Sequence, residues 1–79
     1  MNLSGWFKLA EQHREVDFFY NQNKYSVSVS QLGKWYLTKY GDYVNAQEFD
    51  SFFELIVKSQ IEDIPFKNIC ERFDIDVIY

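Results

Sequence analysis

Few side chains in this sequence have the types and spacing that catalysis or metal binding requires. His13 is the only histidine and Cys70 the only cysteine. A metal shell or a nucleophile with its base needs several such groups at defined spacing, and neither residue has a suitable neighbour in the sequence. We therefore expect no enzyme activity, cofactor or metal. His13 is interpreted as an exposed residue near a helix end, and Cys70 as a small buried hydrophobe.

Carboxylates occur in two close pairs, Glu62-Asp63 and Asp74/Asp76. Acid–base chemistry needs two carboxyl groups that converge in a cleft with separated pKa values, and proximity in sequence does not show convergence. We interpret both pairs as solvated side chains or as a docking patch for a basic partner. The three glycines lie too far apart for a phosphate-binding loop, which disfavours nucleotide binding.

The formal net charge is −4 and is unevenly distributed along the chain. Residues 1–40 carry five basic and three acidic side chains, whereas residues 41–79 carry three basic and nine acidic ones. An acidic chain without a basic stripe repels a phosphate backbone, so we expect no nucleic-acid binding. The lone cysteine, the missing leader pattern and the absence of a long apolar run favour a cytoplasmic protein without membrane association.

The elements that position these side chains follow from the periodicity of apolar residues. Residues 3–10 carry the stripe of an amphipathic helix. Ser51 and Glu54 have the spacing of a capping box, which predicts that a second helix begins there. Pro65 suits the first position of a short third helix, and Asp63 is its expected cap.

Alternating apolar and polar residues predict four antiparallel strands from residue 16 onward, the last of them after a turn at residues 41–42, and a further strand at 73–77. A two-residue turn at Gln22-Asn23 would join the first two strands. This register pairs Phe18 with Val27, so that apolar side chains meet apolar partners on one face.

Two further turns are expected to continue the meander. A three-residue turn at residues 31–33 ends in the glycine that a left-handed position favours, and it pairs Val27 with Leu37. A turn at residues 41–42 pairs Leu37 with Ala46.

The predicted fold class is α+β, with a single domain over residues 1–79. Its elements follow the order α-β-β-β-β-α-α-β, and the helices pack on one face of an antiparallel four-stranded meander. The terminal strand would add to the free edge beside the first strand or pair with a second copy of the chain. The composition, 47% hydrophobic and 20% aromatic, suits a rich core for so short a chain.

The sheet face away from the predicted core carries a surplus of aromatic residues. Strand alternation places Phe19, Tyr36, Tyr40 and Tyr43 there, among serines and a threonine. Tyrosines with outward hydroxyls are typical of interface anchors, because they bury a large area and still bond water when free. Cross-strand pairing on an ordinary exposed sheet and a ligand pocket are the alternatives.

A recurring pattern of aromatic and apolar residues runs through residues 18–73. It consists of Phe19-Tyr20, Tyr25, Lys34 to Thr38, Phe49, Ser51 to Ile56, and Ile64-Pro65-Phe66 through Ile69. The pattern resembles small uncharacterised proteins of Gram-positive bacteria and their mobile elements. This chain departs from theirs where Lys34 separates Gly33 from Trp35 and where its last helix starts. The resemblance implies no activity and no functional residue.

These observations favour a small acidic protein-binding module, such as an inhibitor, immunity or antitoxin-like factor that covers a site on a partner macromolecule. A self-associating structural or regulatory protein, dimerising through the aromatic face, is the alternative. An enzyme or ligand carrier built around His13 is a third hypothesis. The expected contacts are Tyr36, Tyr40, Tyr43 and Phe19, with Glu62, Asp63, Asp74, Asp76, Glu48 and Asp50 as a charged rim.

Overall fold

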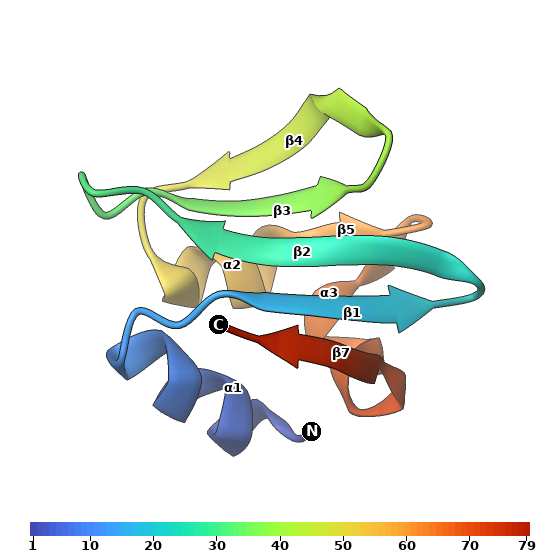
Figure 1. Ribbon diagram of the computed structural model, residues 1–79, viewed down its shortest axis with the longest axis horizontal. Coiled ribbons are helices and arrows are strands. Elements are labelled where there is room, and N and C mark those ends of the chain that lie inside the picture. Colours follow the sequence, from blue (N-terminus) through green and yellow to red (C-terminus); the bar gives the residue numbers. More distant parts are fainter.

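The computed structural model describes residues 1–79 as an antiparallel five-stranded sheet with three helices (Figure 1). The α+β class predicted from the sequence is therefore confirmed. No helix is long and apolar enough to cross a bilayer. In chain order the elements are α1 (Leu3–Glu11), β1 (Val16–Tyr20), β2 (Asn23–Val29), β3 (Trp35–Lys39), β4 (Asp42–Phe49), α2 (Phe52–Lys58), β5 (Gln60–Ile61), β6 (Ile64–Pro65), α3 (Phe66–Ile69), the 3-10 turn η1 (Cys70–Arg72) and β7 (Asp74–Ile78).

The strands lie in the order β4-β3-β2-β1-β7, so the first four form the predicted meander. The strand from the end of the chain, β7, runs antiparallel beside β1, as Figure 1 shows in red against blue. Of the two arrangements expected for this strand, the structure has the one that extends the sheet within a single chain.

The core lies between one face of the sheet and the helices. Alternation places Val16 and Phe18 of β1 on this face, and the inward residues of β2 and β3 follow the same parity. Trp6 of α1 packs edge-on against Phe18 and Phe66, with ring centroids 5.8 and 5.2 Å apart. One cluster of 16 buried residues joins the sheet to all three helices. The remaining face of the sheet is left without a covering layer.

The first hairpin differs from the expected register by two residues. Its turn is formed by Asn21 and Gln22, both with positive φ (49° and 67°), so Phe18 pairs with Tyr25 instead of Val27. Asparagine tolerates the left-handed conformation that the first position of this turn requires, which explains the position of the turn. A shift of two residues keeps every side chain on its predicted face.

The pairing expected between β2 and β3 is confirmed, with Val27 opposite Leu37. The pairing expected between β3 and β4 is wrong, because Leu37 lies opposite Gln47 and not Ala46. Gly41 has a φ of 88° and occupies the second turn position, so the turn comes one residue earlier than expected. The ladder then shifts between Leu37 and Lys39, and eight residues of β4 lie along five of β3.

The serine half of the predicted capping box is present, with the Glu54 N–H donating to Ser51 Oγ at 3.1 Å. The Glu54 carboxylate accepts from the Asp50 N–H at 3.2 Å instead of from the Ser51 N–H. The expected cap of the third helix is wrong. Asp63 instead lies with Glu62 in the turn between β5 and β6, and both residues have positive φ (54° and 65°). The residue before α3 is Pro65, and no side chain caps that helix. The β5–β6 hairpin was not predicted, because two-residue strands are too short to show a period.

Candidate functional site

The sheet face opposite the helices, here called the open face, is crossed by three rows of side chains. Residues opposite one another on neighbouring strands project to the same side of a sheet. The rows are Val77, Asp17, Ser26 and Thr38; Asp74, Phe19, Lys24 and Tyr40; and Ser28, Tyr36 and Glu48.

Asp17 lies near the middle of the open face and is nonetheless only 3% exposed. Its Oδ2 accepts a hydrogen bond from the Tyr40 hydroxyl at 2.9 Å and another from the Tyr79 hydroxyl at 2.7 Å. Ser26, the cross-strand neighbour of Asp17, is small, which leaves room for the Tyr40 side chain to extend over β2. One carboxylate therefore fixes two phenol rings that arrive from opposite sides.

These hydrogen bonds also set the protonation of both phenols. The bond to Asp17 is the main cause that raises the pKa of Tyr79 to about 12, and it likewise raises the pKa of Tyr40. Both hydroxyls therefore remain protonated donors at neutral pH. Because both pKa values are raised, neither phenol is activated as a nucleophile or base. The hydrogen bonds to Asp17 instead hold the two rings in place.

Lys24 lies between the aromatic and acidic side chains of the open face. Its Nζ is 3.2 Å from Asp76 Oδ2 and 3.9 Å from Asp17 Oδ2. The same nitrogen lies 4.6 Å from the Tyr40 ring centroid and 5.8 Å from that of Phe19. The hydrogen bond to Asp76 is the main cause that raises the pKa of Lys24. The ammonium group thus occupies a site built from carboxylates and ring faces, which both attract cations.

The four aromatic residues singled out by the sequence lie as strand parity placed them. Tyr36, Tyr40 and Phe19 belong to the rows of the open face. The Tyr43 ring lies 6.3 Å from that of Tyr40, at the rim formed by β4. The Tyr36 hydroxyl donates to Glu48 Oε1 at 3.1 Å, which fixes a third phenol.

The acidic residues singled out by the sequence separate into two groups. Asp74 and Asp76 lie on β7 and join the open face, where Asp74 is opposite Phe19. Glu62 and Asp63 lie on the β5–β6 hairpin, on the helix side of the sheet. The structure therefore does not bring the two acidic pairs together.

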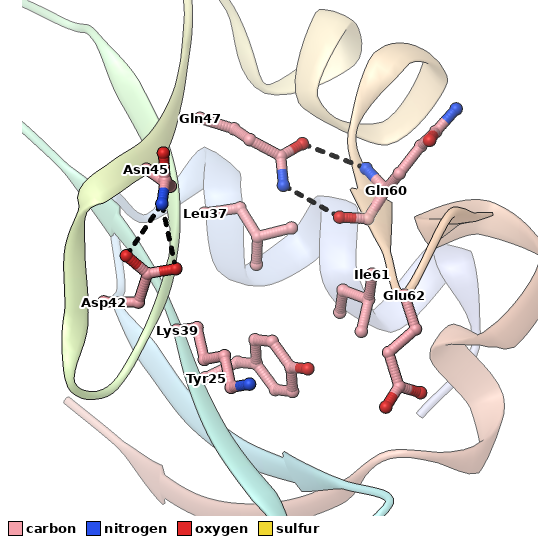
Figure 2. Close-up of a pocket in the computed structure, with 9 residues that line it drawn as sticks. All are labelled: Tyr25, Leu37, Lys39, Asp42, Asn45, Gln47, Gln60, Ile61 and Glu62. Carbon is pink, nitrogen blue, oxygen red and sulfur yellow. Dashed lines mark hydrogen bonds between the residues drawn. The ribbon is translucent and has the colours of Figure 1, made fainter.

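Glu62 lines a pocket of about 270 Å³ on the helix side, shown in Figure 2. Gln47 closes one wall, donating to the Gln60 carbonyl at 2.8 Å and accepting from the Gln60 N–H at 3.0 Å. Glu62 itself accepts a hydrogen bond from Asn21 at 2.7 Å. His13 does not line the pocket, and no three His, Cys, Asp or Glu side chains are grouped to hold a metal ion.

Alternation places Asp17 on the same face as Phe19, but its role, and the roles of Lys24 and Tyr79, were not predicted from the sequence. An acid that alternates with core residues faces solvent, and only the fold shows that two phenols bury Asp17. The position of Tyr79 depends on β7 pairing with β1 over a separation of about 60 residues.

Comparison of the chain with models of known protein families, with curated proteins and with solved structures found no match.

Proposed function

We propose that this protein is a small protein-binding module whose open face covers a site on a partner macromolecule, in the manner of an inhibitor, immunity or antitoxin-like factor. The observation that supports it best is the fixing of Tyr40 and Tyr79 by Asp17 on a sheet face that no other element covers. Rings already held in place lose little conformational entropy on binding, which favours them as interface anchors.

Exposed apolar surface on this face supports the same function. Phe19, Tyr43 and Tyr79 are 38%, 64% and 61% exposed. Tyr40 and Val77 are also exposed, and they lie in the rows that contain Phe19 and Asp17. Large apolar side chains grouped on a polar background are typical of interaction sites.

The edges of the sheet are less suited to binding than its face. The ladder of β4 is interrupted by its bulge, and the ladder between β7 and β1 shifts register between Asp17 and Phe18. Bulges and edge charges, such as those of Asp74 and Asp76, hinder strand addition. The open face therefore suits a partner better than either edge of the sheet does.

The experiment compares affinity columns that carry the wild type, the Tyr36→Ser/Tyr43→Ser double variant, and Phe53→Ser as a control. Phe53 is 65% exposed on α2, on the other side of the molecule. Tyr40 is left in place because it satisfies Asp17. From a lysate of the native host, we expect a protein that the wild type and the control both retain, and about tenfold less of it on the double variant.

Equal recovery of every captured protein on all three columns would show that the open face is not the binding site. Light scattering of the free protein at micromolar concentration tests self-association, the alternative use of the same aromatic rings. A stable dimer that Tyr36→Ser dissociates would favour self-association over a foreign partner.

A further inference from the structure

Most of the net charge of the protein lies on the open face. Strand register and the contact with Lys24 place four acidic side chains there, Asp17, Glu48, Asp74 and Asp76, and one basic side chain, Lys24. Lys34 and Asp50 pair with each other, so their charges cancel. The balance on this face is −3, out of a formal net charge of −4 for the whole chain.

The rest of the molecule is close to electrical balance. The remaining seven acidic and six basic side chains lie on the helices, around the pocket and at the rim, and their formal charges sum to −1. Arg14, at the rim, donates to the backbone carbonyl of Tyr79. The uneven charge seen along the sequence thus becomes, in the folded chain, a difference between two faces.

We propose that the occupant of the open face is a basic surface of a partner protein, which places an arginine side chain at the corner formed by Phe19, Asp74 and Asp76. This inference rests on the proposed protein-binding function and specifies the chemistry of the partner. An acidic face attracts a basic one and accelerates their encounter.

The surroundings of Lys24 show what this corner binds. Its ammonium group contacts Asp76 and lies near Asp17 and two aromatic rings, yet it is one cation among three carboxylates. Asp74 has no ion-pair partner, and the Asp76 side chain stays 37% exposed despite its contact with Lys24.

Arginine suits this arrangement better than lysine. A planar guanidinium stacks on an aromatic ring while it bonds a carboxylate with two parallel hydrogen bonds. Phe19 supplies an exposed ring, and Asp74, its cross-strand neighbour, supplies the carboxylate.

The same charge distribution disfavours the other occupants of the face. Two copies of this chain meeting face to face would bring −3 against −3. Nucleic acids and anionic bilayers carry the same sign of charge as the open face and are repelled.

The test uses three synthetic peptides, octa-arginine, octa-lysine and octa-glutamate, titrated into the 15N-labelled protein and followed by NMR. We expect octa-arginine to shift the amide signals of Phe19, Lys24, Asp74 and Asp76, and to bind more tightly than octa-lysine. Octa-glutamate should cause no shifts. Binding should weaken on raising the ionic strength to 0.15 M, where the screening length is about 8 Å.

Two variants with the same change in net charge separate the corner from general attraction. Asp74→Asn/Asp76→Asn should weaken octa-arginine binding about fivefold, since each exposed ion pair contributes modestly. Glu11→Gln/Glu71→Gln, on the helix side, should weaken it less than about twofold. The NMR spectra report in the same experiment whether each variant is folded.

Equal weakening by the two variants, or shifts centred on the helices, would overturn the proposed corner. If octa-arginine leaves the corner unshifted while Tyr36→Ser/Tyr43→Ser still abolishes partner capture, the partner is not basic but the proposed function stands. If octa-arginine binds the corner while capture is insensitive to the tyrosines, the proposed function fails and the cation site alone remains.

Discussion

The hydroxyl of Tyr40, the residue after β3, donates a 2.9 Å hydrogen bond to Oδ2 of Asp17 on β1, across the intervening strand β2. Tyr79 reaches the same oxygen at 2.7 Å from the opposite side. A buried carboxylate without partners is strongly destabilising, so these phenols stabilise the fold as well as shaping its surface. The bond from Tyr40 crosses a whole strand of the sheet, whereas Tyr79 follows β7, the neighbour of β1.

Replacing Tyr40 by phenylalanine removes one of these bonds and keeps the ring. We expect Tyr40→Phe to lower the free energy of unfolding by about 1 kcal/mol, because Asp17 then has one partner fewer. Urea unfolding followed by tryptophan fluorescence measures the change. Tyr43→Phe is the matched control, since Tyr43 is exposed and only its ring packs near Tyr40. An equal loss in the control would attribute the effect to the phenol in general and not to Asp17.

The phenol of Tyr79 should titrate about two pH units later than an ordinary tyrosine, because its pKa is raised to about 12 by the hydrogen bond to Asp17. The folded state thus holds the proton more tightly than the unfolded state, whose pKa is about 10. The resulting stabilisation is complete below pH 10 and is lost as the pH rises from 10 to 12. An NMR titration of the Tyr79 ring signals measures this pKa.

The matched variant for this titration is Asp17→Asn, which removes the charge that favours the protonated phenol. In this variant the pKa of Tyr79 should fall towards 10. A Tyr79 ring that titrates near pH 10 in the wild type would contradict the hydrogen bond itself.

Much of the fold was predictable because strand alternation fixes which side chains share a face. Val27 and Leu37 lie on the core face as expected, and the terminal strand joins the sheet. The turns were less predictable, because Asn21-Gln22 and Gln22-Asn23 are chemically similar candidates that differ only in register. The bulge in β4 was not predictable, because it is a shift in the pairing of β4 with β3 and leaves no mark in the apolar period of either strand.

The candidate site was predictable only where it depends on parity within one strand. Tyr36 follows from alternation in β3, and Tyr40 continues the same parity one residue beyond that strand. The role of Asp17 depends on Tyr79, which is brought near by a contact between distant parts of the chain. The separation of Asp74 from Glu62 likewise depends on tertiary structure, because β7 joins the sheet while the β5–β6 hairpin lies on its helix side.

Ser59 carries the clearest opportunity to stabilise the protein. Its side chain is fully buried, and its Oγ has no hydrogen-bond partner. Removing an unpaired buried hydroxyl lifts a desolvation penalty, so Ser59→Ala should raise the free energy of unfolding by about 1 kcal/mol. Thermal and urea unfolding both measure this gain.

The same substitution at Ser51 should have the opposite sign. Ser51 Oγ accepts the Glu54 N–H at the start of α2, and losing such a cap costs about 1 kcal/mol. A loss of stability in both variants would show that the Ser59 hydroxyl has a partner after all.

Gln22 holds a conformation that suits glycine better than glutamine. Its φ is 67°, in the second position of the β1–β2 turn, where Asn21 already occupies the first. Glycine relieves the steric cost of this left-handed conformation but adds flexibility to the unfolded chain, so Gln22→Gly should raise the free energy of unfolding by about 0.5 kcal/mol. Gln12→Gly is the control, because Gln12 has a φ of −92° and gains no such relief. That variant should lose stability, and a similar gain at both positions would refute the left-handed turn at Asn21-Gln22.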